Sequence, residues 1–110
     1  MVNKVTLIGR LTRDPEVRQT SGGVAVVSLG LATNSYSGKG DERKEYTEFH
    51  KVTLFGRVAE SVATYLRKGS LVHIEGTLRT QKWTAQDGGD RSEVVVIANE
   101  INFLDKRSDG

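Results

Sequence analysis

Aromatic and basic side chains share one face of a segment in the middle of the sequence. Residues alternate between Tyr46 and Phe55, so Phe49, Lys51 and Phe55 fall on the same side of an extended strand. Burying a lysine there without a partner would be costly, and leaving two phenylalanines bare would waste apolar surface. A groove that stacks nucleobases and neutralises phosphates needs this mixture of rings and cations. The segment therefore predicts a surface for single-stranded nucleic acid.

A second segment repeats the combination. Arg79 and Trp83 lie on the polar face of an alternating stretch with Lys82 adjacent, and Tyr36 adds a ring in a polar stretch between two predicted strands. Taken singly, a phenylalanine on a strand is more often core, and a lone tryptophan near a strand end packs as often as it binds. The shared face favours binding, because packing does not explain why aromatics and cations alternate.

The sequence offers little for catalysis. It lacks the G-x-x-x-x-G-K-[ST] phosphate loop and the H-E-x-x-H zinc motif. His50 and His73 lie on different predicted strands, so each is expected to be structural. Asp41 to Lys44 has the acid-x-Lys form of some nucleases, in a stretch too polar and glycine-rich to hold two metal ligands rigidly. We therefore expect no enzyme activity, no metal and no cofactor.

Hydrophobic periodicity predicts the elements that position these residues. Apolar residues spaced at i, i+4, i+7 and i+8 predict one helix after Gly56, which we expect Gly69 to end. The stretches 12–23 and 34–45 are expected to be loops, the second one mobile, and Asp87-Gly88-Gly89 a turn. Period-two alternation predicts strands at residues 2–11, 24–33, 46–55, 71–83 and about 92–104.

Three strands, one helix and two strands is the order of an OB-fold. We therefore predict an all-β, five-stranded Greek-key barrel with one α-helix between strands 3 and 4, although an antiparallel α+β sandwich shares the strand count. Ligands of this fold lie across strands 2 and 3 and beside the loops that join strands 1–2 and 4–5. The predicted rings and cations are well placed for that surface.

The whole chain allows one small domain. It has 110 residues, 36% of them hydrophobic, with no cysteine and a net charge of +2 from 16 basic and 14 acidic residues. This weakly basic balance is compatible with a nucleic-acid partner and does not require one. No stretch has the length of a membrane span or the form of a targeting segment, so we expect a soluble protein. A chain this short also gains stability from oligomerisation.

Ordered blocks along residues 1 to about 104 resemble the bacterial single-stranded DNA-binding proteins of the replicative, homotetrameric kind. So many blocks in the same order make the resemblance highly specific. The matching blocks are Val2-Asn3-Lys4-Val5, Leu7-Ile8-Gly9-Arg10-Leu11, Asp14-Pro15-Glu16-Val17-Arg18, Thr47-Glu48-Phe49-His50, Leu54-Phe55-Gly56-Arg57, Tyr65-Leu66-Arg67-Lys68-Gly69-Ser70, Ile74-Glu75-Gly76-Thr77-Leu78-Arg79-Thr80, Lys82-Trp83 and Glu93-Val94-Val95-Val96.

The resemblance implies sequence-independent binding and protection of single-stranded DNA during replication, recombination and repair. It implies a homotetramer with D2 symmetry that wraps DNA, with His50 near a subunit interface, in the bacterial cytoplasm and associated with the nucleoid. Phe49 and Tyr36 stand where tryptophan is common in the family, and both keep a flat ring that can stack. Implied stacking residues are Trp83, Phe55, Phe49 and Tyr36; implied phosphate contacts are Lys4, Arg10, Lys51, Arg57, Arg67, Lys68, Arg79, Lys82 and Arg91.

The two ends of the chain carry further expectations. The first strand offers Val5, Leu7 and unpaired edge groups for contact with another chain. Residues 1–104 are expected to form the DNA-binding domain, and 105–110 a short polar end. The family normally continues through a glycine-rich linker to an acidic tip that recruits replication and repair proteins. That tip is absent here, whether through truncation or in a naturally tail-less member, so recruitment of those partners is not expected.

Two other classes of function remain open from the sequence. One is a dimeric OB-fold accessory of replication, or an RNA-binding OB module, which would share the predicted barrel and its basic groove. The other is a metal-dependent nuclease, whose only support is the acid-x-Lys stretch. Mass in solution and competition between DNA and RNA would separate the first class, and incubation of labelled oligonucleotide with Mg²⁺ would separate the second.

Overall fold

The computed structural model describes residues 1–105, and most of them lie in strands. A ten-residue helix, α1, joins the fourth strand to the fifth, and a single 3-10 turn lies at Gly40–Glu42. The strands are β1 Val5–Leu11, β2 Glu16–Gln19, β3 Ala25–Ser37, β4 Lys44–Phe55, β5 Leu71–Thr84 and β6 Asp90–Phe103, and α1 spans Gly56–Tyr65.

Five of the strands close into a barrel. Their order is β1-β5-β6-β4-β3, and β1 pairs back with β3 at Arg10↔Ala32 and Leu11↔Leu31. One contact in the ring is parallel, where Val52 of β4 lies opposite Val96 of β6. A closed ring with one helix confirms the predicted OB-fold and excludes the open α+β sandwich.

Strand β2, which is not part of the ring, lies where a loop was predicted. It pairs antiparallel with the start of β3, from Glu16↔Ser28 to Gln19↔Ala25, outside the closed ring. All four of its side chains are exposed. The prediction of a loop was wrong because a short edge strand without a buried face carries no period-two signal.

The barrel interior is filled by aliphatic side chains from every strand of the ring. Leu29, Leu31, Leu54 and Ile74 are fully buried. Helix α1 contributes Ala59 and Val62, and Leu66 follows directly after it. The helix ends at Tyr65, so the expectation that Gly69 ends it was wrong: Gly69 has a φ of 92° in the separate turn that leads into β5.

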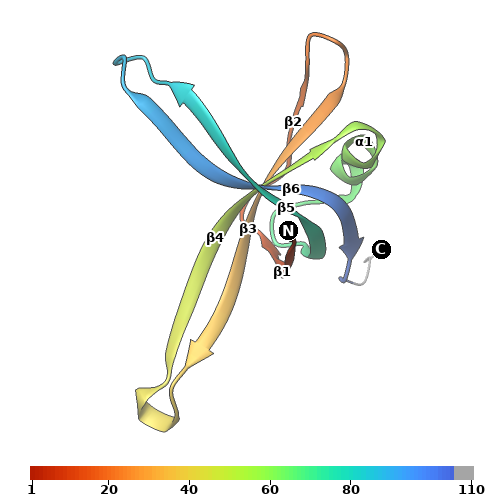
Figure 1. Cartoon of the computed structure of the whole chain (residues 1–110). Coiled ribbons are helices and arrows are strands. Elements are labelled where there is room, and N and C mark those ends of the chain that lie inside the picture. Colours follow the sequence, from red (N-terminus) through yellow and green to blue (C-terminus); the bar gives the residue numbers. More distant parts are fainter. Residues whose placement is uncertain (106–110) are drawn as a thin grey trace.

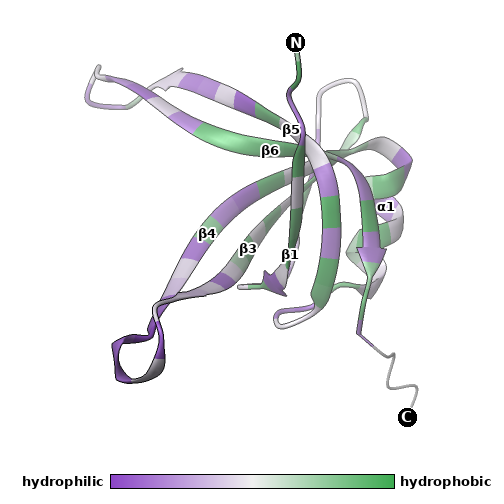
Figure 2. Cartoon of the chain, turned by 60° about the horizontal axis from the view of Figure 1, so that its bottom comes forward, coloured by the Kyte–Doolittle hydropathy of each residue, from purple (hydrophilic) through white to green (hydrophobic). Residues whose placement is uncertain are grey.

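Two long hairpins leave the barrel as arms in different directions (Figure 1). The β3–β4 arm stays paired from Val26↔Phe55 to Ser37↔Lys44, so half of the loop predicted at 34–45 is strand and only residues 38–43 connect the strands. The prediction was wrong for the paired half, because an arm exposed on both faces shows no apolar alternation. Figure 2 shows the hydrophilic end of this arm beside the apolar stripes of the barrel.

The β5–β6 arm begins at an irregularity. The register changes between Glu75↔Glu100 and Gly76↔Ala98, which leaves one extra residue on β6. A Cβ at Gly76 would overlap the carbonyl oxygen of Ile97, so the two backbones meet more closely than any side chain permits. Beyond this point β5 leaves the core, and Leu78, which alternation places with the core residue Ile74, is 49% exposed, whereas its partner Val96 on β6 still closes the ring against Val52.

Candidate nucleic-acid interface

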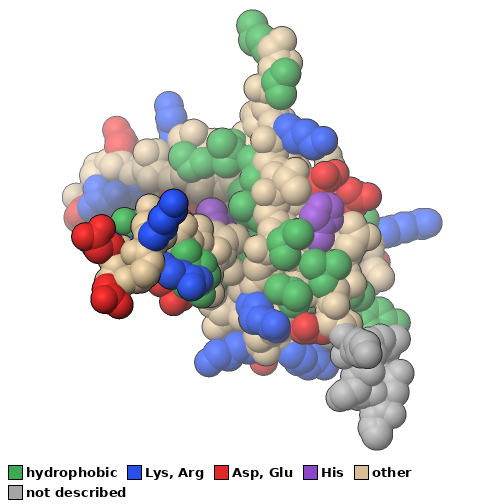
Figure 3. Space-filling view, turned by 90° about the horizontal axis from the view of Figure 1, so that it is seen from below, with side chains coloured by type: hydrophobic (Ala, Val, Ile, Leu, Met, Phe, Trp, Pro, Cys, Tyr) green, Lys and Arg blue, Asp and Glu red, His purple; other side chains and the backbone are tan. Residues whose placement is uncertain are grey.

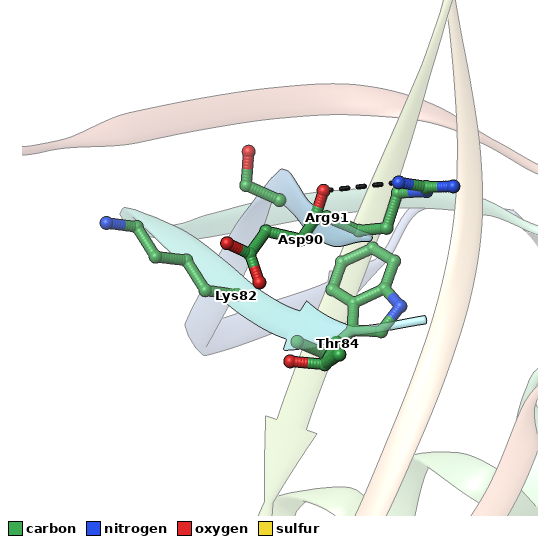
Figure 4. Close-up of a pocket in the computed structure, with 6 residues that line it drawn as sticks. Lys82, Thr84, Asp90 and Arg91 are labelled. Carbon is green, nitrogen blue, oxygen red and sulfur yellow. Dashed lines mark hydrogen bonds between the residues drawn. The ribbon is translucent and has the colours of Figure 1, made fainter. Parts of the chain in front are cut away.

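Trp83 lies near the end of β5, with its ring accessible to solvent. Its side chain is 47% exposed, and the residue opposite on β6 is Arg91. On one side it lines a hollow of about 500 Å³, here named the outer pocket (Figure 4). In that pocket Arg91 donates to the carbonyl oxygen of Asp90 at 3.3 Å and to the Asp87 carboxylate at 2.8 Å. The outer pocket is lined by Lys82, Trp83, Thr84, Asp90, Arg91 and Ser92.

A second hollow of about 550 Å³, the inner pocket, shares Trp83 and Lys82 with the first. It lies where β2, β4 and the β5–β6 arm meet. Lys51 and Glu93 face each other across it, with Nζ 2.8 Å from Oε1. The inner pocket is lined by Arg18, Lys51, Gln81, Lys82, Trp83 and Glu93.

Arg18 was missed by the prediction of phosphate contacts. It lies on β2 opposite Val26, and its Nε is 3.6 Å from a Glu16 carboxylate oxygen. The only available signal was its membership of a matching sequence block, since the stretch around it was predicted to be a loop. Pairing of β2 with β3 is what brings this guanidinium beside Trp83.

The predicted face of β4 is exposed over most of its length. Phe49 is 73% exposed and Phe55 is 43% exposed, with Lys51 exposed between them. The face is interrupted at Thr53, which is only 5% exposed opposite the equally buried Ser28. Because Lys51 also lines the inner pocket, it joins the aromatic face of β4 to Trp83.

Tyr36 lies apart from the pockets, near the end of the β3–β4 arm. Its position opposite Glu45 puts it about 13 Å along the arm from Phe49, on the same face. Tyr36 is 55% exposed, and the Arg43 guanidinium lies 4.1 Å from the centroid of its ring. One side of this ring is therefore already covered by a cation.

All nine predicted phosphate contacts are exposed, but the structure does not gather them at one place. Arg10 donates to the Gly69 carbonyl oxygen at 2.9 Å and lies 3.6 Å from Asp105, at the start of β5. Between residues 71 and 83 a strand rises about 40 Å, so this group lies far from Trp83. Arg67 and Lys68 accompany Arg10 in the turn after α1, whereas Lys51, Lys82 and Arg91 line the pockets.

The three remaining predicted cations occupy other parts of the barrel. Lys4 immediately precedes β1, Arg79 lies opposite Val95 on the β5–β6 arm, and Arg57 lines a shallow hollow beside α1 and Phe103. Acidic and basic side chains are interspersed on the face seen from below, with hydrophobic side chains exposed between them (Figure 3). The pockets therefore differ from the rest of the surface in where their charges lie, and not through the net charge of the chain.

The predicted contacts between chains lie on β1 and β4. Val5 and Leu7 of β1 are half-buried and pack against the core, whereas Ile8, the next residue along the strand, is 56% exposed. One edge of β1 pairs with β5. Among the described residues, the opposite edge pairs with β3 only at Arg10 and Leu11, so it is unpaired along residues 5–9. His50 is half-buried, and its Nε2 lies 2.9 Å from the Thr33 hydroxyl.

The stretch considered for metal binding lies at the exposed end of the β3–β4 arm. Asp41 and Glu42 belong to the 3-10 turn, which has no buried residue. Across residues 1–105, no three His, Asp or Glu side chains are grouped so that they could hold a metal ion. In the same part of the chain, no helix has the length and apolar character needed to cross a membrane.

Comparison with known sequences gives matches along nearly the whole chain. Residues 2–104 match the family described as the single-strand binding protein family. The chain is 43% identical to the single-stranded DNA-binding protein of Xylella fastidiosa and 42% identical to that of Xanthomonas axonopodis pv. citri. Both alignments cover 99% of this chain, but they cover 67% and 61% of the relatives' own lengths.

Solved structures share the fold. An SSB from Plasmodium falciparum in complex with ssDNA superposes with a TM-score of 0.87 at 29% identity, covering 96% of this chain and 97% of that one. A deletion mutant of the single-stranded DNA binding protein from Thermus aquaticus superposes with a TM-score of 0.84 at 39% identity. That alignment covers 96% of this chain and 52% of the Thermus chain.

Proposed function

This chain belongs to the single-strand binding protein family, and from that premise we propose that it binds single-stranded DNA without regard to sequence. One observation carries the proposal: the inner pocket puts Trp83 beside Lys51, the cation that separates Phe49 and Phe55 on β4. Every base has a flat face that such rings can stack on, so this surface does not select a sequence. As a member of this family, the protein binds DNA and is not an enzyme.

Stacking on exposed rings supplies the contacts to the bases. Trp83, Phe49 and Phe55 have between 43% and 73% of their surface exposed, so a base can reach each ring without unfolding the barrel. Tyr36 extends the track along the β3–β4 arm, with one ring side already held by Arg43. Stacking of this kind is worth about 1–3 kcal/mol per base.

The cations neutralise the phosphates along a path that is longer than the pockets. Lys51, Lys82 and Arg91 serve the nucleotides beside Trp83, and Arg18 joins them there. Arg10, Arg67 and Lys68 lie far from Trp83 at the other end of β5, with Lys4, Arg57 and Arg79 elsewhere on the barrel. A DNA strand that contacts all of these cations must wrap around the barrel.

We propose a homotetramer with D2 symmetry as the active assembly. The open edge of β1 beside Val5 and Leu7 supports pairing with a second chain, and the exposed Ile8 provides apolar surface there. Two such pairs placed back to back give a closed assembly with His50 near an interface. Light scattering at micromolar concentration is expected to give the mass of four chains, and a monomer would contradict the proposal.

The biological role we propose is protection of single-stranded DNA in replication, recombination and repair, in the cytoplasm at the nucleoid. Recruitment of replication and repair proteins is not assigned to these residues, because the chain spans only about two thirds of the curated relatives it matches. The short polar end predicted at 105–110 lies, apart from Asp105, outside the described residues.

The test is a titration with poly-dT at several salt concentrations while the mass in solution is recorded. If Z phosphates are neutralised, the logarithm of affinity falls with the logarithm of salt at a slope near −0.7Z. Duplex DNA of the same length is expected to bind far more weakly, because paired bases cannot reach the rings. A slope of zero would contradict the proposal that cations in the groove neutralise phosphates. A dimeric mass would favour the accessory protein of replication, and a preference for RNA would favour the RNA-binding module.

A further inference from the structure

An ion pair occupies the inner pocket. The Lys51 ammonium donates to Glu93 Oε1 at 2.8 Å, joining β4 to β6, and both side chains remain partly exposed, at 41% and 36%. The lining of the pocket contains three cations and this one carboxylate beside Trp83. A nucleotide stacked on Trp83 would bring its phosphate into contact with these charges.

The cations of the pocket differ in what they already contact. The Lys82 ammonium has no hydrogen-bond or ion-pair partner within residues 1–105, so it meets an arriving phosphate without exchanging a partner. Arg18 has a longer contact of 3.6 Å to Glu16 on its own strand. Lys51 is the one of the three whose charged group lies closest to a carboxylate, so it is the cation for which an arriving phosphate has a direct competitor.

We propose that Glu93 competes with DNA for Lys51 and thereby limits both the affinity and the salt sensitivity of binding. This inference rests on the proposed function. A phosphate at Lys51 competes with the Glu93 carboxylate for the ammonium, and a carboxylate that loses this partner binds a cation from solution instead. The cation gathered offsets one cation released from the DNA, so Lys51 adds little to the net release that drives binding.

The competition predicts a gain of function on removal of the acid. In Glu93→Gln, Lys51 is free to bind phosphate, and affinity for poly-dT is expected to rise several-fold at low salt. The slope of log affinity against log salt is expected to steepen by about 0.7, the share of one additional phosphate contact. The matched control is Glu60→Gln, which removes the same charge from α1, an element without a residue in the pocket.

A double variant tests whether the gain passes through Lys51. In Glu93→Gln/Lys51→Met the pair is removed with no change in net charge, and affinity and slope are expected to return to about the wild-type values. Persistence of the gain would overturn the proposal, because the gain would then come from general charge. The exchanged pair, Lys51→Glu/Glu93→Lys, keeps an ion pair and is expected to resemble wild type in slope and melting temperature.

The outcomes separate this inference from the function on which it rests. If wild type binds with a steep salt dependence and Glu93→Gln behaves like Glu60→Gln, the inference is wrong and the function stands. If wild type itself shows no binding or no salt dependence, the function fails first. A lower melting temperature of Glu93→Gln with unchanged slope would make the pair a purely structural link between β4 and β6, which also overturns the proposal.

Discussion

The two arms of the molecule are built alike but end differently. At the end of β5–β6, Asp87 accepts from the Gly89 backbone N–H and from the Arg91 guanidinium, each at 2.8 Å, so side chains hold the turn. The β3–β4 arm ends in the 3-10 turn, where the backbone N–H groups of Glu42 and Arg43 donate to the Lys39 and Gly40 carbonyl oxygens. No residue of this turn is buried.

The arms also differ in what they bring to the barrel. Trp83 on β5–β6 meets residues of β2, β4 and β6 in the inner pocket, so its surroundings are defined by tertiary contacts. Tyr36 on β3–β4 has Arg43, a residue of the same arm, as its close neighbour. A ring in a pocket with cations on several sides is expected to contribute more to binding than a ring on a bare arm.

The largest expected effect is on folding, at the bases of the arms. Gly76→Ala puts a Cβ against the Ile97 carbonyl and 2.8 Å from the Ala98 Cα, where backbone must shift. Overpacking of this kind is expected to cost about 3 kcal/mol of unfolding free energy. Gly30→Ala on β3 meets mainly the Thr12 hydroxyl, which can rotate away. Thermal melts are expected to show a sharp loss for Gly76→Ala and a milder one for Gly30→Ala; equal losses would contradict the comparison.

The next effect is on binding through the β5–β6 arm. Trp83→Ala is expected to weaken binding by about tenfold or more, because stacking is worth about 1–3 kcal/mol per base. Its melting temperature should change little, since Trp83 is 47% exposed. Trp83 is the only tryptophan, so its quenching by single-stranded DNA reports this site alone. A collapsed melting temperature with normal affinity would make Trp83 a packing residue.

A smaller effect is expected on the β3–β4 arm. Tyr36→Ala should weaken binding by about fivefold, the lower end of the stacking range, because Arg43 covers one side of the ring. Tyr36→Phe keeps the flat ring and is the control. Fluorescence titration with poly-dT measures both variants, and a loss as large as that of Trp83→Ala would remove the distinction between the arms.

The smallest effect is expected at the ends of the arms. Asp87→Ala removes two hydrogen bonds to an exposed carboxylate, so we expect a loss of at most about 1 kcal/mol in unfolding free energy. Asp41→Ala in the 3-10 turn is expected to change stability by less than about 0.5 kcal/mol, as exposed substitutions usually do. Denaturant unfolding of the two variants side by side checks the order.

Alternation along the chain was sufficient to predict the barrel. Strands with one face in the core carry a period-two pattern, and Leu29, Leu31, Leu54 and Ile74 mark it. The same physics explains the errors: β2 and the outer half of the β3–β4 arm bury nothing, so their pairing leaves no hydrophobic pattern. Backbone hydrogen bonding between neighbouring strands forms there without any apolar signal.

The sequence by itself determined the barrel, the helix and the types of side chain that the site uses. Only the tertiary structure decided which of them lie together: Arg18 comes to Trp83 through the pairing of β2, while Arg10, Arg67 and Lys68 end at the far end of β5. It also decided that Lys51 faces Glu93, a residue 42 positions away in the chain. Periodicity reports which face of a strand is buried, whereas contacts between strands depend on register and barrel closure, which no local pattern contains.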